Sequence, residues 1–317
     1  MPITICETCG SVFQQESGTC PDCGRPISPR GEDIRRMPHE VVLGFLEHAE
    51  ELLASGPFRQ AVLAFAAGSF IAFGAVLSVA LTTDVEPIGI SRLLLGLGFA
   101  AGFVMVILSG SALFTEINVL LPEIFLSRPR DLCRRCWRFW LITYLGNAVG
   151  ALFVGLLITQ SHLLGERQEL RLFEILAEKM EFRDLGLEGW FAVLLSGILG
   201  SWLVGMAAFL ATAARTVSGK ILGVLFPILA FVAIGVQHSP ANMGYFSMGL
   251  IRGGSGIGWG EAILWNIIPA SLGNIIGGAV LVALLFWYTY GQEPQQRQRL
   301  KCAGELVRQQ PKKVESQ

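Results

Sequence analysis

Charged residues are scarce in this chain. Aspartate, glutamate, lysine and arginine make up 15% of its 317 residues, whereas 52% are hydrophobic and 37 are glycine. Soluble domains carry about 25% charged residues, so this composition excludes an ordinary soluble protein and favours a membrane protein. The net charge of −1 gives no support for binding to nucleic acid.

Charge is missing altogether over five long segments. These segments are 61–81, 93–115, 139–161, 190–214 and 262–290. Each reaches the roughly 20 residues needed to cross a hydrocarbon core of about 30 Å. A sixth apolar run, 221–251, is interrupted at residues 235–243. The sequence therefore predicts an all-α membrane domain of six spans over residues 57–291.

Positive charge is distributed unevenly among the loops. It gathers between spans two and three, between spans four and five, and after the last span, at Arg128, Arg130, Arg134, Arg135, Arg138, Arg215, Lys220, Arg297, Arg299, Lys301, Arg308, Lys312 and Lys313. The positive-inside rule then predicts cytoplasmic termini for a multi-pass protein of the inner (plasma) membrane. The polar, cysteine-rich first 50 residues predict no cleavable signal peptide.

The interruption at residues 235–243 places polar and helix-breaking residues inside an apolar run. They are Gln237, His238, Ser239, Pro240 and Asn242. Backbone groups at membrane depth must be paired, so such a break must face protein or a water-filled cavity. An ionisable side chain there indicates a functional site. We interpret His238 as the controlling group of a pore; the alternative is a histidine that only makes an interhelical hydrogen bond.

A duplicated pattern runs through the two halves of the chain. Leu145-Gly-Asn-Ala-Val-Gly150 lies in the third span and Leu272-Gly-Asn-Ile-Ile-Gly277 in the sixth. Each follows an interrupted span, at residues 109–116 and 235–243. Three spans per copy is an odd number, so the pattern predicts two inverted three-helix repeats with broken second and fifth helices, an aquaporin-like architecture. On their own, the glycines of the motif indicate close helix packing.

Several motifs occur together with this pattern. They are Leu113-Phe-Thr115, the two Leu-Gly-Asn motifs, Glu178-Lys179, Phe231-Val-Ala-Ile-Gly235 and His238-Ser-Pro-Ala-Asn-Met243. In this combination, over roughly residues 40–290, the chain resembles the formate/nitrite transporter family. The resemblance implies a homopentamer in the lipid bilayer that transports small monovalent anions.

The resemblance also implies roles for individual residues. His238 is expected at the pore centre, bonded to the hydroxyl of Thr115, with Asn242 nearby in the same motif. An imidazole titrates near neutrality and can lend a proton to an anion that would otherwise cross a dry pore at high cost. Lys179 is expected to draw anions into the outer vestibule, although a lysine among acids is more often simply solvated. We expect the half-helix ends to offer unpaired N–H groups.

Apolar constrictions are expected on both sides of the histidine. Alignment with the family points to Phe99, Phe103, Leu113 and Phe231, each of which is also an ordinary packing residue. Three positions depart from the family pattern. Gln237 stands in place of an acid, Glu116 in place of a small residue, and Ser201 in place of an asparagine. The choice among formate, nitrite, hydrosulfide, acetate and lactate therefore stays open.

Cysteine pairs mark the first 30 residues. Cys6-Glu-Thr-Cys9 and Cys20-Pro-Asp-Cys23 are separated by ten residues, a spacing that suits tetrahedral Zn²⁺ with four thiolate ligands. Cytoplasmic thiols stay reduced, and so short a ribbon needs the metal to fold. We predict a structural zinc ribbon at residues 1–30 that could bind a cytoplasmic protein partner; a redox role is the minor alternative.

Two further segments complete the domain plan. Residues 31–56 predict a linker and an amphipathic helix along the inner membrane face, and residues 292–317 a cytoplasmic tail. A second pair, Cys133 and Cys136, lies among arginines between spans two and three. That pair is weak evidence, either for incidental cysteines or for redox sensing.

These observations lead to one main hypothesis and one competitor. We predict an anion channel or proton-linked transporter and no enzyme, because a metal site of four cysteines leaves no open position for catalysis. The competitor is a non-conducting scaffold or sensor, in which a degenerate channel anchors the zinc ribbon to the membrane.

Overall fold

The computed structural model describes residues 4–5, 11–13, 18–24, 26–27, 35–127 and 130–291. The chain divides into two compact units, one formed by Met1–Ile34 with Tyr290–Gln317 and the other by Arg35–Thr289. The predicted tail at residues 292–317 lies outside the described residues.

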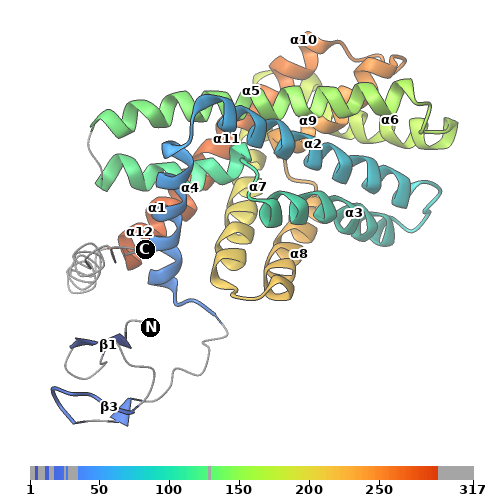
Figure 1. Cartoon of the computed structure of the whole chain (residues 1–317). Helices are drawn as coiled ribbons and strands as arrows, with labels where there is room; N and C mark the ends of the chain where they lie inside the picture. The colour runs from blue at the N-terminus through green and yellow to red at the C-terminus, as the bar shows by residue number, and fades with distance from the viewer. Residues whose placement is uncertain are drawn as a thin grey trace, which may run out of the picture. The chain divides into compact units, whose positions relative to one another are not determined.

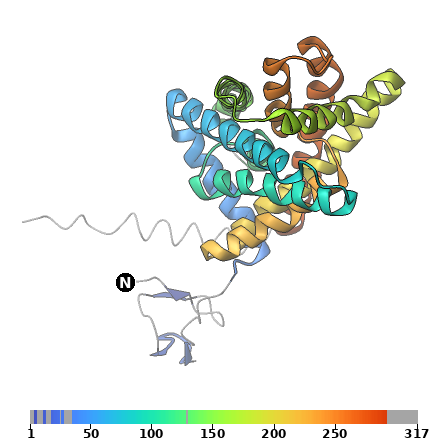
Figure 2. The same ribbon diagram turned by 90° about the vertical axis from the view of Figure 1, so that its right-hand side faces the viewer.

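The larger unit is all-helical (Figures 1 and 2). Its elements are α1 (Pro38–Ala54), α2 (Pro57–Thr82), α3 (Ile88–Ser109), α4 (Phe114–Ser127), α5 (Arg130–Gln160), α6 (Glu166–Met180), η1 (Glu181–Leu185), α7 (Leu187–Ala213), α8 (Val217–Ile234), α9 (Ser239–Arg252), α10 (Trp259–Ala262), η2 (Ile263–Ile267), α11 (Ile268–Gly278), η3 (Ala279–Leu284) and α12 (Leu285–Tyr290). Within the described residues, 6 helical stretches are long and apolar enough to cross a membrane, which confirms the predicted spans.

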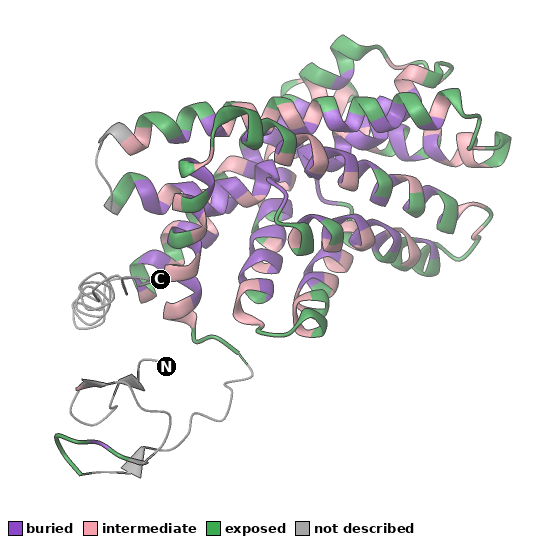
Figure 3. Ribbon diagram, in the orientation of Figure 1, coloured by how far each residue is buried: buried purple, intermediate pink, exposed green. Residues whose placement is uncertain are grey.

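The outer surface of these helices is apolar. Large hydrophobic side chains such as Leu145, Leu199 and Phe226 are exposed, whereas the inward faces are buried (Figure 3). Soluble monomers rarely expose apolar surface on this scale, so the pattern fits helices that meet lipid or further copies of the chain.

Glycines hold two helix pairs in close contact, α2 against α5 and α7 against α11. A Cβ atom added to Gly150 would lie 2.1 Å from the carbonyl oxygen of Phe65, and one added to Gly273 would lie 2.1 Å from that of Leu194. Both glycines belong to the duplicated motifs. The close-packing interpretation of those glycines is confirmed.

The two interrupted spans end and restart in the same way. Helix α3 ends at Gly110 with φ 67°, and α8 ends at Gly235 with φ 86°. This left-handed conformation suits glycine, which has no Cβ to clash. After each glycine a short extended stretch leads into α4 or α9. Helix α9 then packs on α2 and α5, while α4 packs on α7 and α11.

The asparagines of the duplicated motifs cap the restarted helices. The Oδ1 atom of Asn147 accepts from the Phe114 N–H at 2.8 Å, and its Nδ2 donates to the Ala64 and Ala112 carbonyls at 2.8 and 3.0 Å. In the other half, Asn274 Oδ1 accepts from the Ser239 N–H at 2.8 Å. Its Nδ2 donates to the Gly197 and Gln237 carbonyls at 2.8 and 3.1 Å. Each side chain thus satisfies backbone groups that the break would otherwise leave unpaired.

The sixth span contains two π-helical segments, η2 and η3, that the apolar pattern did not predict. Pro269 lies two residues after the end of η2, in the first turn of α11. Proline has no N–H to donate to the preceding turn, and a wider turn is one way in which a helix accommodates that loss.

Helix α1 lies before the first span and packs on α4, α5 and α7. Its apolar stripe includes Val41, Phe45, Ala49 and Leu53, all of them buried. The amphipathic character is as expected, but protein contacts rather than lipid bury much of the apolar face.

The smaller unit contains two antiparallel hairpins. Strand β1 (Thr4–Ile5) pairs with β2 (Val12–Phe13), and β3 (Gly18–Thr19) pairs with β4 (Pro26–Ile27). Cys20 and Cys23 lie in the turn of the second hairpin, where the Gly24 N–H donates to the Cys20 carbonyl at 2.9 Å.

The asparagine caps generate a stability prediction. Asn147→Ala leaves the buried Phe114 N–H without its partner and removes the bonds to the Ala64 and Ala112 carbonyls, so the free energy of unfolding should fall by about 1–3 kcal/mol. Thermal unfolding of the purified protein in detergent measures this loss. The control is Thr159→Ala on the same helix, whose hydroxyl bonds only the Gly155 carbonyl; its effect should stay within about 0.5 kcal/mol. Equal stability of the two variants would contradict the capping role.

Candidate functional site

A cavity of about 740 Å³ opens among the α2–α3 loop, α6, the end of α8 and the start of α9. Polar and charged residues line its outer part, among them Asp84, Glu86, Arg92, Arg167, Arg171, Glu174, Glu178, Lys179 and Glu181. Its inner part is lined by Phe99, Phe231, Gln237, His238 and Tyr245. The cavity therefore runs from a charged mouth to a buried, largely aromatic floor that contains the histidine of the second interruption.

His238 joins the two interruptions. Its Nε2 lies 2.8 Å from the hydroxyl oxygen of Thr115, which belongs to the first turn of α4, and both residues are fully buried. Its Nδ1 accepts from the Ala241 N–H at 3.3 Å. A backbone N–H can only donate, so Nδ1 carries no proton, and a neutral ring then carries its proton on Nε2 and donates to Thr115. The expected bond between His238 and Thr115 is present.

The amide groups at the start of α9 are occupied. Asn274 bonds the Ser239 N–H, His238 bonds that of Ala241, and Pro240 has none. The expectation that this half-helix offers unpaired N–H groups to an anion is therefore wrong for these positions. Side chains from the protein fill the places that an anion would take, because the backbone cannot stay unpaired in the apolar interior.

Aromatic rings surround the histidine. The Phe99 and Phe231 rings meet edge to face at 5.5 Å, and the Phe231 ring lies 5.4 Å from that of His238. The Phe103 ring lies 6.2 Å from His238, and Leu113 is buried just before Thr115. Phe99 and Phe231 line the cavity, whereas Phe103 and Leu113 do not. Two of the four apolar residues therefore lie on the cavity side of His238, and the other two lie outside the cavity lining.

Lys179 lies near the end of α6 with its Nζ 5.3 Å from the centre of the Tyr245 ring. Burial lowers the pKa of this ammonium to about 8, against the opposing effect of Glu178. Favourable contact of a cation with an aromatic face helps to hold the side chain over the ring. The structure therefore presents a partly buried cation to the cavity.

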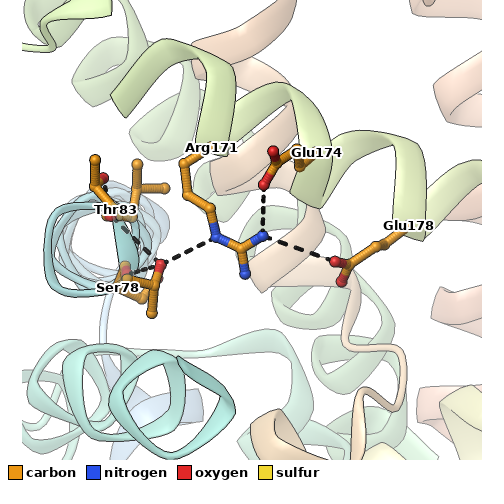
Figure 4. Close-up of polar contacts among 7 residues, drawn as sticks. Ser78, Thr83, Arg171, Glu174 and Glu178 are labelled. Carbon is orange, nitrogen blue, oxygen red and sulfur yellow. Dashed lines mark hydrogen bonds and ion pairs between the residues drawn. The ribbon is translucent and has the colours of Figure 1, made fainter. Parts of the chain in front are cut away.

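Arg171 lies on the same helix, α6, and also lines the cavity; Figure 4 shows its contacts. Its guanidinium donates to Glu174 at 2.9 Å, lies 3.8 Å from Glu178, and donates through Nε to the Thr82 hydroxyl at 3.3 Å. Arg171 is therefore paired with the carboxylates of both Glu174 and Glu178. Sequence reasoning missed Arg171 and Tyr245, because a charge on an amphipathic helix and a tyrosine in a span carry no distinctive local pattern.

Behind Gln237 lies a network of side-chain amides. The Nδ2 of Asn242 donates to Gln237 Oε1 at 2.8 Å and to Asn266 Oδ1 at 2.6 Å. The Nδ2 of Asn266 donates to the Lys179 carbonyl at 2.8 Å and lies 3.3 Å from Gln237 Oε1. Asn242 is thus a neighbour of Gln237 outside the cavity lining, and Asn266 is a member that the sequence did not suggest.

The two remaining departures from the family pattern lie outside the cavity lining. Ser201 is buried in α7, where a Cβ added to Gly278 would come within 3.2 Å of its hydroxyl. Glu116 is in the first turn of α4, directly after Thr115. Neither of these side chains belongs to the lining of the cavity.

The proposed metal ligands are only partly described. Cys6 and Cys9 lie outside the described residues, and in the part of the chain that is described no group of three or more candidate ligands comes together. Cys133 and Cys136 lie near the start of α5, one half-buried and the other buried among apolar residues.

Comparisons with known proteins agree with this architecture. Residues 39–288 match the family model described as formate/nitrite transporter. The chain is 35% identical over 249 residues to a probable formate transporter of Methanothermobacter thermautotrophicus, which covers 73% of this chain and 89% of the relative. It is 29% identical over 257 residues to the formate channel FocA of Escherichia coli K12, covering 75% and 88% respectively.

Two solved structures superpose on most of this chain. A pentameric formate channel with formate bound superposes with a TM-score of 0.61 at 25% identity, covering 74% of this chain and 98% of that one. An FNT family ion channel superposes with a TM-score of 0.66 at 25% identity, covering 80% and 98%. The chain belongs to the formate/nitrite transporter family.

Proposed function

We propose that this protein is a homopentameric pore that carries small monovalent anions of weak acids, such as formate or nitrite, across the inner membrane. The observation that supports it most is the bond between His238 and Thr115, which links the two helix interruptions at the floor of a cavity with a charged mouth. A membrane anchor without transport has no physical need for a buried ionisable residue there, so we favour the pore over the scaffold or sensor.

We further propose that the membrane unit consists of two inverted repeats with cytoplasmic termini. The matching pairs α2–α5 and α7–α11, and the matching caps of Asn147 and Asn274, support two copies of one plan. Three spans per copy require opposite insertion, and the distribution of arginine and lysine favours cytoplasmic ends. The cavity mouth would then face the periplasmic side.

The proposed path begins at Lys179 and passes Phe99 and Phe231 to reach His238. The lysine raises the local concentration of anions, and the apolar rings exclude hydrated ions. An unpaired anion is costly in such surroundings, and a proton shared from His238 through the Thr115 hydroxyl reduces that cost. An imidazolium would lose the bond from the Ala241 N–H, so the charged ring is a transient state.

Transport and its dependence on His238 can be tested in proteoliposomes of the purified protein. We expect flux of formate or nitrite to exceed that of empty liposomes and to depend on pH between mildly acidic and neutral conditions. His238→Phe should abolish the pH-dependent part of the flux while the protein stays folded. The matched control is His39→Phe in α1, outside the cavity lining, which should conduct as the wild type does. Flux by His238→Phe with an unchanged pH profile would exclude the proton-sharing role.

Lys179 gives a second pH signature. A pKa of about 8 means that the ammonium is charged below that pH and neutral above it, so attraction of anions weakens as pH rises through about 8. Formate flux at low ionic strength should therefore fall several-fold across this range, because formate itself stays ionised. Lys179→Arg keeps its charge at all these pH values and should remove the fall. Lys179→Gln should give low flux throughout; wild-type flux from that variant would contradict the role of the charge.

We propose, finally, that residues 1–30 bind one structural zinc ion through Cys6, Cys9, Cys20 and Cys23. The hairpin turn that carries Cys20 and Cys23, closed by the bond from the Gly24 N–H, supports a knuckle of this kind. A metal would supply the folding energy of so small a unit.

Elemental analysis of the purified protein tests this site. The wild type should contain about one zinc per chain, as a site of four thiolates requires, and Cys20→Ser with Cys23→Ser should lose it. The paired control is Cys133→Ser with Cys136→Ser, which removes the Cys-x-x-Cys motif outside residues 1–30 and should keep its zinc. Zinc absent from the wild type, or retained when Cys20 and Cys23 are replaced, would refute the assignment.

A further inference from the structure

The amide network behind Gln237 has a fixed orientation. It begins at the Lys179 carbonyl, which can only accept, so the group of Asn266 that lies 2.8 Å away must be its NH₂. Asn266 Oδ1 must then accept from Asn242 Nδ2, at 2.6 Å. The second hydrogen of Asn242 goes to Gln237 at 2.8 Å, so the atom of Gln237 in that contact is its oxygen. One backbone carbonyl thereby sets the direction of three side-chain amides.

This orientation leaves the nitrogen of Gln237 for the cavity. Its Oε1 faces the two asparagines, and within the described residues its Nε2 makes no hydrogen bond. Gln237 lines the cavity next to His238. The nitrogen is therefore the part of this side-chain amide that is left to meet the cavity.

Several polar groups at this depth are already engaged. The two ring nitrogens of His238 bond Thr115 and the Ala241 N–H. The Ser239 N–H at the start of α9 is bonded by Asn274. The Ser196 hydroxyl, which also lines the cavity, accepts from the Gln237 backbone N–H at 3.1 Å and retains an O–H that can donate. The floor of the cavity thus offers the Gln237 amide, beside that hydroxyl, as an uncharged donor on the cavity side of the histidine.

We propose that the Gln237 amide nitrogen binds the transported anion at the cavity floor, as a donor to an oxygen of a small planar oxyanion such as formate or nitrite. This assignment rests on the proposed function. A carboxylate at position 237 would accept the same bonds from Asn242 and Asn266, but it would turn a negative oxygen towards the anion. The amide keeps the structural contacts and reverses the polarity of the face that meets the cavity.

Two substitutions remove the donor in different ways. Gln237→Glu keeps the oxygen that the asparagines need and replaces only the NH₂. Gln237→Met adds no charge, but it removes both the NH₂ and the oxygen that Asn242 and Asn266 contact. The matched control is Gln168→Glu, which lies outside the cavity lining and keeps an acceptor for the Gly165 N–H, at 2.7 Å in the wild type. All four proteins are reconstituted as full chains, and formate flux is measured against formate concentration at one pH, so that the proton concentration is the same for every variant.

Each outcome bears on the proposal. We expect both Gln237 variants to raise the KM for formate about tenfold or more, as loss of a hydrogen bond to a charged group does, while Gln168→Glu matches the wild type. Size-exclusion chromatography checks that each variant stays assembled. A wild-type KM in Gln237→Met would overturn the donor role, even if Gln237→Glu is impaired, because charge repulsion alone would then explain the effect. Wild-type protein that moves no anion would instead overturn the proposed function itself.

Discussion

Two helices stop and restart inside the membrane unit, and the rest of the structure depends on pairing the backbone groups that this exposes. In an apolar interior an unpaired N–H or carbonyl costs several kcal/mol. Asn147 and Asn274 supply the missing partners, one at each interruption. They reach those groups because glycines at neighbouring positions allow α5 and α11 to approach α2 and α7 within contact of the backbone. The capping by the asparagines therefore depends on the close packing that the glycines allow.

The capping of backbone groups by side chains also determines which groups at the site remain to contact a solute. With the N–H groups of Phe114, Ser239 and Ala241 occupied, the proposed path relies on side chains: Lys179 at the mouth, the Gln237 amide beside the histidine, and the rings of Phe99 and Phe231. A cation at the cavity mouth, a neutral donor at the cavity floor and apolar rings around the path would suit an anion that loses its hydration water in steps.

Much of the fold was accessible from the sequence. Uncharged stretches of spanning length identify six spans, and the glycine and proline residues of the two interruptions identify where helices stop. The Leu-Gly-Asn motifs were interpreted through their glycines, and the capping role of the asparagines became evident only when Asn147 and Phe114 were seen in contact, 33 positions apart. Contacts between distant segments have no local signal, and that is also why Asn266, Tyr245 and Arg171 were missed. The π-helical segments of the last span escaped for another reason, since helix periodicity does not distinguish a π turn from an α turn at this length.

The start of helix α9 illustrates a different limit of sequence analysis. A helix start in an apolar run suggests free N–H groups for an anion, but the sequence cannot say whether a side chain from another span already takes them. At α9 it does, through Asn274 and His238. The departure at Gln237 was read as a lost acid, whereas the arrangement of Asn242 and Asn266 makes it a donor of defined direction.

In the proposed path an anion passes between the two helix interruptions at His238. A cryo-electron microscopy structure of the protein in lipid nanodiscs, recorded with and without saturating formate, would locate that anion. We expect a pentamer in which formate adds density within each protomer, between the Phe99–Phe231 pair and the His238–Thr115 pair. Formate bound only outside the protomers, for instance along the axis between them, with water-free packing at His238, would contradict the proposed path.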